Sequence, residues 1–198
     1  MSARLAVALA LVVPVAVACA SAPTGLACPP GTEATSGPTA SGREQWCRRP
    51  DGVRHGPYVA WHARGRKQAE GTFVDGREDG AWTRWFANGR LLASGAYATG
   101  VKQGRWRFWH SAGAPQEAGE FRDGREQGTW TRWFENGRML SEGSYRDGVA
   151  QGPWTFWYDS GRVKETGEYR DGLRHGRWRR WSVKGQPCDG EPASPPTA

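Results

Sequence analysis

The 198-residue sequence has few aliphatic side chains, which argues against a globular protein with a thick aliphatic core. Hydrophobic residues make up only 37% of the chain, with 2 methionines, yet there are 12 tryptophans and 28 glycines. No segment keeps a sustained helical period, so helices are not expected. Many indoles with many glycines suit a thin structure in which rings cover the backbone, and the length suits one domain with tails.

Motifs for catalysis and metal binding are also missing. No Cys-x-x-Cys pair occurs, which argues against a zinc site or a thioredoxin-like site. The glycine-rich stretches lack the Gly-Lys-Ser/Thr ending of a phosphate-binding loop, and no serine matches a histidine in a recognisable triad. Asp and Glu cluster in turns, where Asp stabilises the turn geometry. The sequence therefore predicts a protein that is not an enzyme and holds neither a metal ion nor a cofactor.

The N-terminus contains one uncharged run, from Leu5 to Ala18. Its length fits the core of a signal peptide, residues 1–18, and is short for a membrane span. Ala16-Val17-Ala18-Cys19 resembles the bacterial lipobox. This resemblance implies a lipidated Cys19 and a protein anchored in the bacterial cell envelope, at the outer membrane if one is present. The alternative is ordinary secretion to the periplasm or beyond, because the same residues fit an A-x-A cleavage site.

Three further cysteines follow Cys19. Two of them lie in or beside residues 19–50, a Pro/Gly/Ser/Thr-rich segment predicted to be a lipidated, flexible linker. In an oxidising compartment, a disulfide between Cys28 and Cys47 would close a short loop and contribute about 3 kcal/mol. Cys188 is left as the odd cysteine, and its state stays open.

Glycine spacing indicates how the chain is organised. Four rows of glycines recur at intervals of 24 residues and hold 23 of the 28 glycines, and tryptophan follows the same step. This fixed period predicts a repeat array over residues 51–188, with six units of which the last is partial, before a disordered tail, 189–198. Units 75–98 and 123–146 share 16 of 24 residues, whereas 75–98 and 99–122 share 6. The true period is therefore 48, which duplication of a two-hairpin block or selected alternation of Arg and Phe would explain.

Each unit has the pattern of two strands. Asn88-Gly89 predicts a two-residue type I′ turn between them, and Asp75-Gly76 begins the connection from one unit to the next. That turn would place Trp82 opposite Gly95, where the indole covers bare glycine backbone. Strand alternation then puts Trp82 on one face and Trp85 on the other. The predicted fold class is all-β, an elongated single-layer antiparallel meander of about six tandem 24-residue β-hairpin repeats.

Two segments carry a family resemblance. GEYRDGLRHGRWRRW (167–181) and GSYRDGVAQGPWTFW (143–157) resemble MORN repeats, whose pattern is G-x-[YF]-x-[DN]-G-x-x-x-G-x. The likeness is to the bacterial variant in which Trp replaces the second Gly of the usual G-x-G, often catalogued among antitoxins of toxin–antitoxin systems. The resemblance extends over 51–188 and implies an elongated, twisted sheet that acts as a scaffold or binding surface.

A candidate binding surface lies on the face that carries Trp85. One tryptophan per unit shares this position, with arginines on the returning strands expected beside it. The residues are Trp61, Trp85, Trp109, Trp133, Trp157 and Trp181, with Arg66, Arg90, Arg138 and Arg162. Such a ladder would stack against sugar rings, lipid head groups or protein side chains. The alternative is that these tryptophans only pack against one another and against aliphatic stems.

The charge bears on the choice of partner. The formal net charge of +7 favours anionic partners, although arginine also keeps an aromatic-rich sheet soluble. The predicted function is a non-enzymatic, envelope-anchored repeat protein that offers a binding or scaffold surface to a protein, glycan or lipid partner. The alternative, implied only by the family resemblance, is a toxin-neutralising antitoxin or immunity-type protein. Export argues against a nucleic-acid partner despite the basic charge and the tryptophans.

Overall fold

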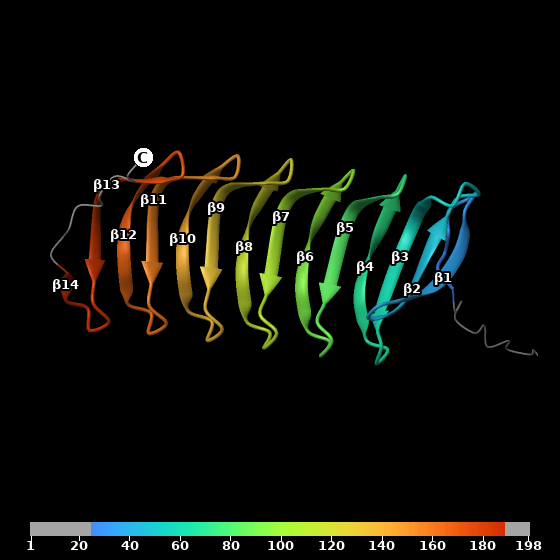
Figure 1. The fold of residues 1–198 in the computed structure, drawn as a ribbon, viewed down its shortest axis with the longest axis horizontal. Coiled ribbons are helices and arrows are strands. Elements are labelled where there is room, and N and C mark those ends of the chain that lie inside the picture. The colour runs from blue at the N-terminus through green and yellow to red at the C-terminus, as the bar shows by residue number, and fades with distance from the viewer. Residues whose placement is uncertain (1–24, 189–198) are drawn as a thin grey trace, which may run out of the picture.

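The computed structural model of the chain describes residues 25–188. These residues contain no helix and form one antiparallel sheet of 14 strands, which follow one another in chain order (Figure 1). The predicted all-β meander of hairpins is confirmed. The predicted signal peptide 1–18, the lipidation site Cys19 and the tail 189–198 lie outside the described residues.

Every strand pairs only with the strands next to it in the sequence. The strands are β1 (Glu33–Thr39), β2 (Gly42–Arg48), β3 (Arg54–His62), β4 (Lys67–Val74), β5 (Arg77–Trp85), β6 (Leu91–Ala98), β7 (Val101–Trp109), β8 (Pro115–Arg122), β9 (Arg125–Trp133), β10 (Met139–Arg146), β11 (Val149–Trp157), β12 (Val163–Arg170), β13 (Leu173–Trp181) and β14 (Pro187–Cys188).

The tight two-residue turns lie between the units. At Asp75-Gly76, φ is 50° at Asp75 and 77° at Gly76, and Val74 pairs with Arg77 across the turn. Positive φ at both central residues defines a type I′ turn, which Asp and Gly tolerate. The sequence pattern assigns this turn type to Asn88-Gly89 instead, and that assignment is wrong.

The loop at Asn88-Gly89 is longer than predicted. The Gly89 N–H donates to the Phe86 carbonyl at 2.8 Å, and the Phe86 N–H donates to the Arg90 carbonyl at 2.8 Å. Within this loop only Gly89 has a positive φ, 87°. The Asn88 side-chain oxygen accepts the Arg90 N–H at 3.0 Å. The same loop forms where Arg64 or Ala112 stands in place of Asn88, so this hydrogen bond supports the loop but does not select it.

Each buried tryptophan covers a glycine, but not the one predicted. Trp82 pairs with Gly95 in register, as expected, yet a Cβ atom at Gly95 would lie 2.2 Å from the Trp106 indole. Trp82 covers Gly71, where a Cβ atom would lie 2.3 Å from its ring. The register shift that causes this is located at Gly80, where φ is 70° and β5 bulges opposite Gly71.

These contacts lock each hairpin onto the preceding hairpin rather than closing the hairpin that contains the tryptophan. The same contact recurs in successive units. The Gly–Trp locks are Gly71–Trp82, Gly95–Trp106, Gly119–Trp130, Gly143–Trp154 and Gly167–Trp178.

The locked indoles belong to a continuous ladder of rings along one face of the sheet, the covered face. From Tyr58 to Trp178, neighbouring ring centroids lie 5.0–6.4 Å apart, mostly edge to face. Edge-to-face pairs at such separations contribute about 0.5–1.5 kcal/mol each beyond area burial. Trp106 and Trp130 are each 1% exposed. The core of this single-layer sheet is therefore aromatic and lies on one face.

The 48-residue period has a physical counterpart on the covered face. Arg84 donates to the Tyr97 hydroxyl at 3.0 Å and forms an ion pair with Glu78 at 2.6 Å. In the next unit Phe108 replaces Arg84 and stacks on Trp106, with centroids 5.7 Å apart. Arg132 and Phe156 repeat this alternation in the following two units. Alternation keeps two partly buried guanidinium groups from lying on adjacent hairpins.

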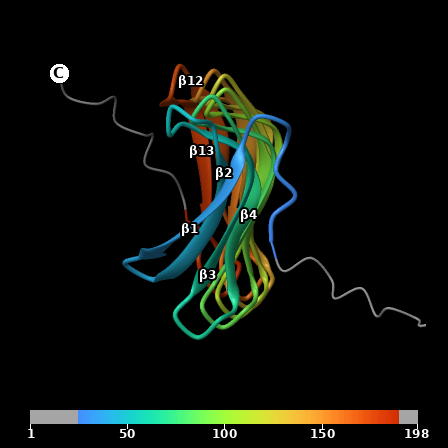
Figure 2. The same cartoon turned by 90° about the vertical axis from the view of Figure 1, so that its right-hand side faces the viewer.

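The segment 19–50 was predicted to be a flexible linker, but residues 33–48 of it form the N-terminal part of the sheet. Strands β1 and β2 form a hairpin there, tilted against the strands behind it (Figure 2). Cys47 occupies the glycine position of a lock, is fully buried, and is joined to Cys28 by a disulfide. A side chain fits there because Tyr58 stands where the next unit has the larger Trp82. The polar composition was misleading because it suits an exposed end hairpin as well as a linker.

Candidate binding surface

The predicted tryptophans lie on the second face of the sheet, opposite the covered face. Strand alternation turns each of them away from the ladder, and each is partly buried. Trp85 pairs across its hairpin with Leu91, and Trp133 pairs with Met139. From Trp85 onward the tryptophans and their partners form an apolar stripe across the strands, whereas Trp61 pairs with Lys67 and has the Arg43 guanidinium 4.4 Å from its ring centroid. We call these six tryptophans the Trp row: Trp61, Trp85, Trp109, Trp133, Trp157 and Trp181.

The four arginines predicted beside the Trp row hold neighbouring turns together instead. Arg66 donates to the Asn88 carbonyl, one unit further along, at 2.6 Å. The other three make equivalent contacts: Arg90 to Ala112, Arg138 to Asp159 at 3.0 Å, and Arg162 to Val183 at 3.1 Å. A guanidinium bound to turn carbonyls fixes the spacing of adjacent hairpins. These four residues therefore have a structural role, and all four are exposed, so their part in a binding surface stays a prediction.

A groove of about 270 Å³ opens on the second face near the middle of the sheet. The residues that line it are Arg105, Arg107, Phe108, Trp109, Pro115, Glu117, Ala118 and Trp133, and Glu117 forms an ion pair with Arg132 at 3.1 Å. Arg105 and Arg107 are exposed. Arg107 lies between Ser94 and Ala118 in the strand pairing, whereas Arg105 is paired with Glu120 but forms no ion pair with it. Within residues 25–188, both guanidinium groups are left without a carboxylate partner.

The same construction recurs three units later, at the C-terminal end. The sequence RWRFW (105–109) becomes RWRRW (177–181), and a proline again pairs with the last tryptophan. Here the groove has a volume of about 340 Å³ and includes Arg177, Arg179, Trp181 and Pro187 in its lining. The units in between carry uncharged residues at the two arginine positions: Thr129 and Thr131, then Pro153 and Thr155.

The sequence interpretation did not include Arg105, Arg107, Arg177 and Arg179, because it considered arginines on the returning strands only. The available signal was Arg-Trp-Arg within one strand. With a buried tryptophan at the centre, alternation sends both arginines to the opposite face. The structure brings them beside Trp109 and Trp181 of the predicted Trp row.

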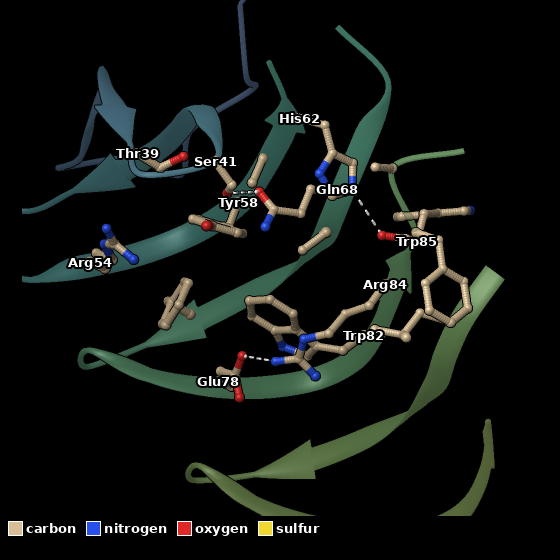
Figure 3. Close-up of a pocket in the computed structure, with 16 residues that line it drawn as sticks. Thr39, Ser41, Arg54, Tyr58, His62, Gln68, Glu78, Trp82, Arg84 and Trp85 are labelled. Carbon is tan, nitrogen blue, oxygen red and sulfur yellow. Dashed lines mark hydrogen bonds and ion pairs between the residues drawn. The ribbon is translucent and has the colours of Figure 1, made fainter. Parts of the chain in front are cut away.

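A larger groove, of about 520 Å³, lies on the covered face near the N-terminal end (Figure 3). Its charged side chains satisfy one another: Arg54 pairs with Glu44 at 2.7 Å, and Arg84 pairs with Glu78 at 2.6 Å. The Tyr58 hydroxyl donates to Glu44 at 2.8 Å. Burial, reinforced by this carboxylate, raises the pKa of Tyr58 to about 12. The groove is internally neutralised, so it offers less to a charged ligand than the grooves of the second face.

Lys102 shows how the covered face uses charge. Its ammonium lies 4.7 Å from the ring centroid of Trp106 and 4.8 Å from that of Phe108. Burial, followed by the positive charge of Arg84, lowers the pKa of Lys102. A cation held over ring faces is stabilised by their quadrupoles, so this lysine contributes to packing.

The remaining polar candidates have packing roles or none that the structure assigns. His62 donates from Nε2 to the Trp85 carbonyl at 3.0 Å, as the figure shows (Figure 3). No three His, Cys, Asp or Glu side chains within residues 25–188 come together as a metal site would need. In the same part of the chain, no helix has the length and hydrophobicity to cross a membrane. Cys188 is an exposed free thiol.

Fold and surface together define a class of protein, an open repeat sheet in which each unit packs only on its neighbours. Two segments, residues 126–147 and 150–171, match the family described as MORN repeat variant. This match supports a MORN-type repeat protein, as the sequence resemblance predicts. No curated protein matches the chain.

Proposed function

We infer that the protein is a non-enzymatic, envelope-anchored scaffold whose second face binds a protein, glycan or lipid partner. The contrast between the two faces carries this inference. The ladder tryptophans of the covered face are 1–3% exposed, whereas the Trp row stays partly exposed. A single-layer sheet can cover one face with its own rings, and an apolar stripe left on the other face favours contact with a partner. The match to MORN-type repeats supports the same role.

The anchoring part of the proposal rests on Cys19. Cells expressing the full chain or Cys19→Ala would be labelled with a fatty-acid analogue and separated into membrane and soluble fractions. We expect label and membrane association in the wild type, and loss of both in the variant. Equal labelling of the two proteins, or equal membrane association, would contradict a lipid anchor at Cys19.

The binding part of the proposal rests on the Trp row. Purified chain would be co-sedimented with cell-envelope preparations, comparing the wild type with Trp85→Ala and Trp133→Ala. We expect reduced sedimentation for both variants. Arg146→Ala, an exposed change at the other end of a strand, serves as the control. Unchanged sedimentation of correctly folded Trp variants, checked by circular dichroism, would mean that this face is not the binding surface.

A further inference from the structure

The two Arg–Trp grooves of the second face are copies of one arrangement. In each, two arginines precede a tryptophan of the Trp row on the same strand, by four and two residues, and a proline lies across from that tryptophan. One arrangement is on β7 and the other on β13. The intervening units keep the tryptophan but lose both arginines. The repeat framework does not require arginine at these positions, so the pair of grooves needs a reason beyond folding.

Their charge is unneutralised within the described part of the chain. Arg107 lies between Ser94 and Ala118, and Arg179 pairs with Thr166. By contrast, the covered-face arginines, such as Arg84 and Arg132, pair with carboxylates. The exposed guanidinium groups are free to accept a planar anion in bidentate geometry, which Arg suits better than Lys.

We propose that the two grooves bind one chain of a carboxylate-bearing polysaccharide, laid along the second face across the strands. The proposal names the partner class of the surface described under the proposed function and rests on that function. An indole face carries negative potential, which suits the C–H faces of a sugar ring, while the arginines hold its carboxylates. The grooves are open to solvent and aligned along the long axis of the sheet, which suits an extended chain.

Spacing makes the arrangement selective for long chains. Grooves on β7 and β13 are six strand steps apart, roughly 29 Å at about 4.8 Å per strand. A polysaccharide that spans both grooves binds the second one intramolecularly, so its affinity exceeds that of a fragment that fills only one. A short fragment gains nothing from the second groove.

Other partners fit the observations less well. A bilayer surface would favour several protruding apolar side chains beside the arginines. Val101, Val149 and Leu173 are exposed at the opposite ends of the strands, next to the type I′ turns. Of the large apolar side chains within residues 25–188, only Leu91 and Val183 are exposed at the ends that carry the Trp row. A single-stranded nucleic acid could also stack on indoles. However, the signal peptide expected at 1–18 would place the chain outside the cytoplasm, away from most nucleic acid.

The test measures binding of the detergent-solubilised full chain to polygalacturonate by titration calorimetry. The ligands are the long polymer, a short oligogalacturonide, and the fully methyl-esterified polymer, which has no carboxylate charge. We expect the long polymer to bind at least about tenfold tighter than the short one, and the esterified polymer not to bind. Arg107→Ala and Arg179→Ala should each lower the affinity for the long polymer to that of the wild type for the short one. The double variant should lose binding.

Arg146→Ala is the matched control, because it removes the same charge from an exposed site outside both grooves. Equal binding of long and short chains, binding of the esterified polymer, or indifference to the double variant would each overturn the proposal. So would Arg107-dependent and Arg179-dependent binding of oligothymidylate or anionic vesicles in place of polygalacturonate. If Trp133→Ala abolishes envelope binding but polygalacturonate does not bind, the scaffold function stands and the polysaccharide assignment fails.

Discussion

The two ends of the sheet are built on the same repeat but are closed in different ways. At the N-terminal end, the hairpin β1–β2 extends the array, and the buried Cys47 is fixed to Cys28 by a disulfide. At the C-terminal end, β13 is exposed along most of its length and β14 has two residues. Units of a repeat array are stabilised by their neighbours. The first end is therefore held covalently, whereas the second depends on one Gly–Trp lock.

The locks themselves differ along the sheet. The indole N–H groups of Trp82, Trp106 and Trp130 donate to backbone carbonyls at 3.0–3.2 Å. The equivalent N–H groups of Trp154 and Trp178 are buried without an acceptor among the described residues. A buried polar group without a partner costs about 1–3 kcal/mol. We therefore expect the array to be less stable toward its C-terminal end, where local opening should begin.

The largest effect is expected from breaking a lock in the middle of the sheet. In Gly119→Ala the new Cβ would lie 2.3 Å from the Trp130 ring, and strands on both sides prevent relaxation. We expect a loss of about 3 kcal/mol in urea unfolding. Gly167→Ala makes an equally close contact with Trp178, but the exposed β13 can move away, so its loss should be smaller.

The N-terminal end suggests the control for this experiment. There a side chain at the glycine position coexists with Tyr58. Adding Trp130→Tyr to Gly119→Ala should therefore recover part of the stability, as a favourable coupling in a double-mutant cycle. A double variant no more stable than the additive expectation would mean that ring size does not decide which residue the lock accepts.

The second effect concerns the covalent closure. Cys47→Ser should destabilise the N-terminal end by about 2 kcal/mol, because the disulfide closes a short loop and the residue is fully buried. Hydrogen exchange should increase over β1 to β3 and stay unchanged over β12 and β13. Cys188→Ser, at the exposed free thiol, is the control and should change nothing. Equal loss of protection at both ends would show that the ends do not behave independently.

The third effect compares two ladder tryptophans. Trp130→Phe removes a ring and a hydrogen bond to Glu120, whereas Trp154→Phe removes a ring and an N–H that has no acceptor within residues 25–188. We expect Trp130→Phe to cost about 1 kcal/mol more than Trp154→Phe. Thermal unfolding of the pair measures this difference. The reverse order would contradict the proposed loosening toward the C-terminal end.

The smallest effect is a pH dependence confined to the N-terminal end. The pKa of Tyr58 is raised to about 12 from its ordinary value of 10.0. Between these values the unfolded chain loses the phenolic proton first, so stability falls as pH rises. The contribution is complete below pH 10 and is lost by about pH 12. In the wild type, the hydrogen-exchange protection of β3 should fall between about pH 9.5 and pH 11, and Tyr58→Phe should make this fall smaller. An equal fall in the variant would exclude Tyr58 as the cause of the pH dependence.

The sequence predicted the repeats well because glycine and tryptophan recur at a fixed step. Hairpins, period and the two faces followed from that step and from strand alternation. The turn types were exchanged, because Phe86 pairs with Arg90 and leaves a three-residue loop, and the same loop forms where Arg64 or Ala112 replaces Asn88. The locks were assigned to the wrong glycine, because the bulge at Gly80 shifts β5 against β4. Both errors concern register, which depends on neighbouring strands rather than on local composition.

By itself, the sequence determined that the chain is a row of hairpins with rings over glycine. Only the tertiary structure decided which residues are free to bind. The guanidinium of Arg66 donates to the Asn88 carbonyl of the next unit, a contact that the sequence did not predict. Arg107, which the sequence interpretation did not single out, lies between the uncharged Ser94 and Ala118. A side chain's availability depends on what lies across the sheet from it, and that is fixed by pairing between strands.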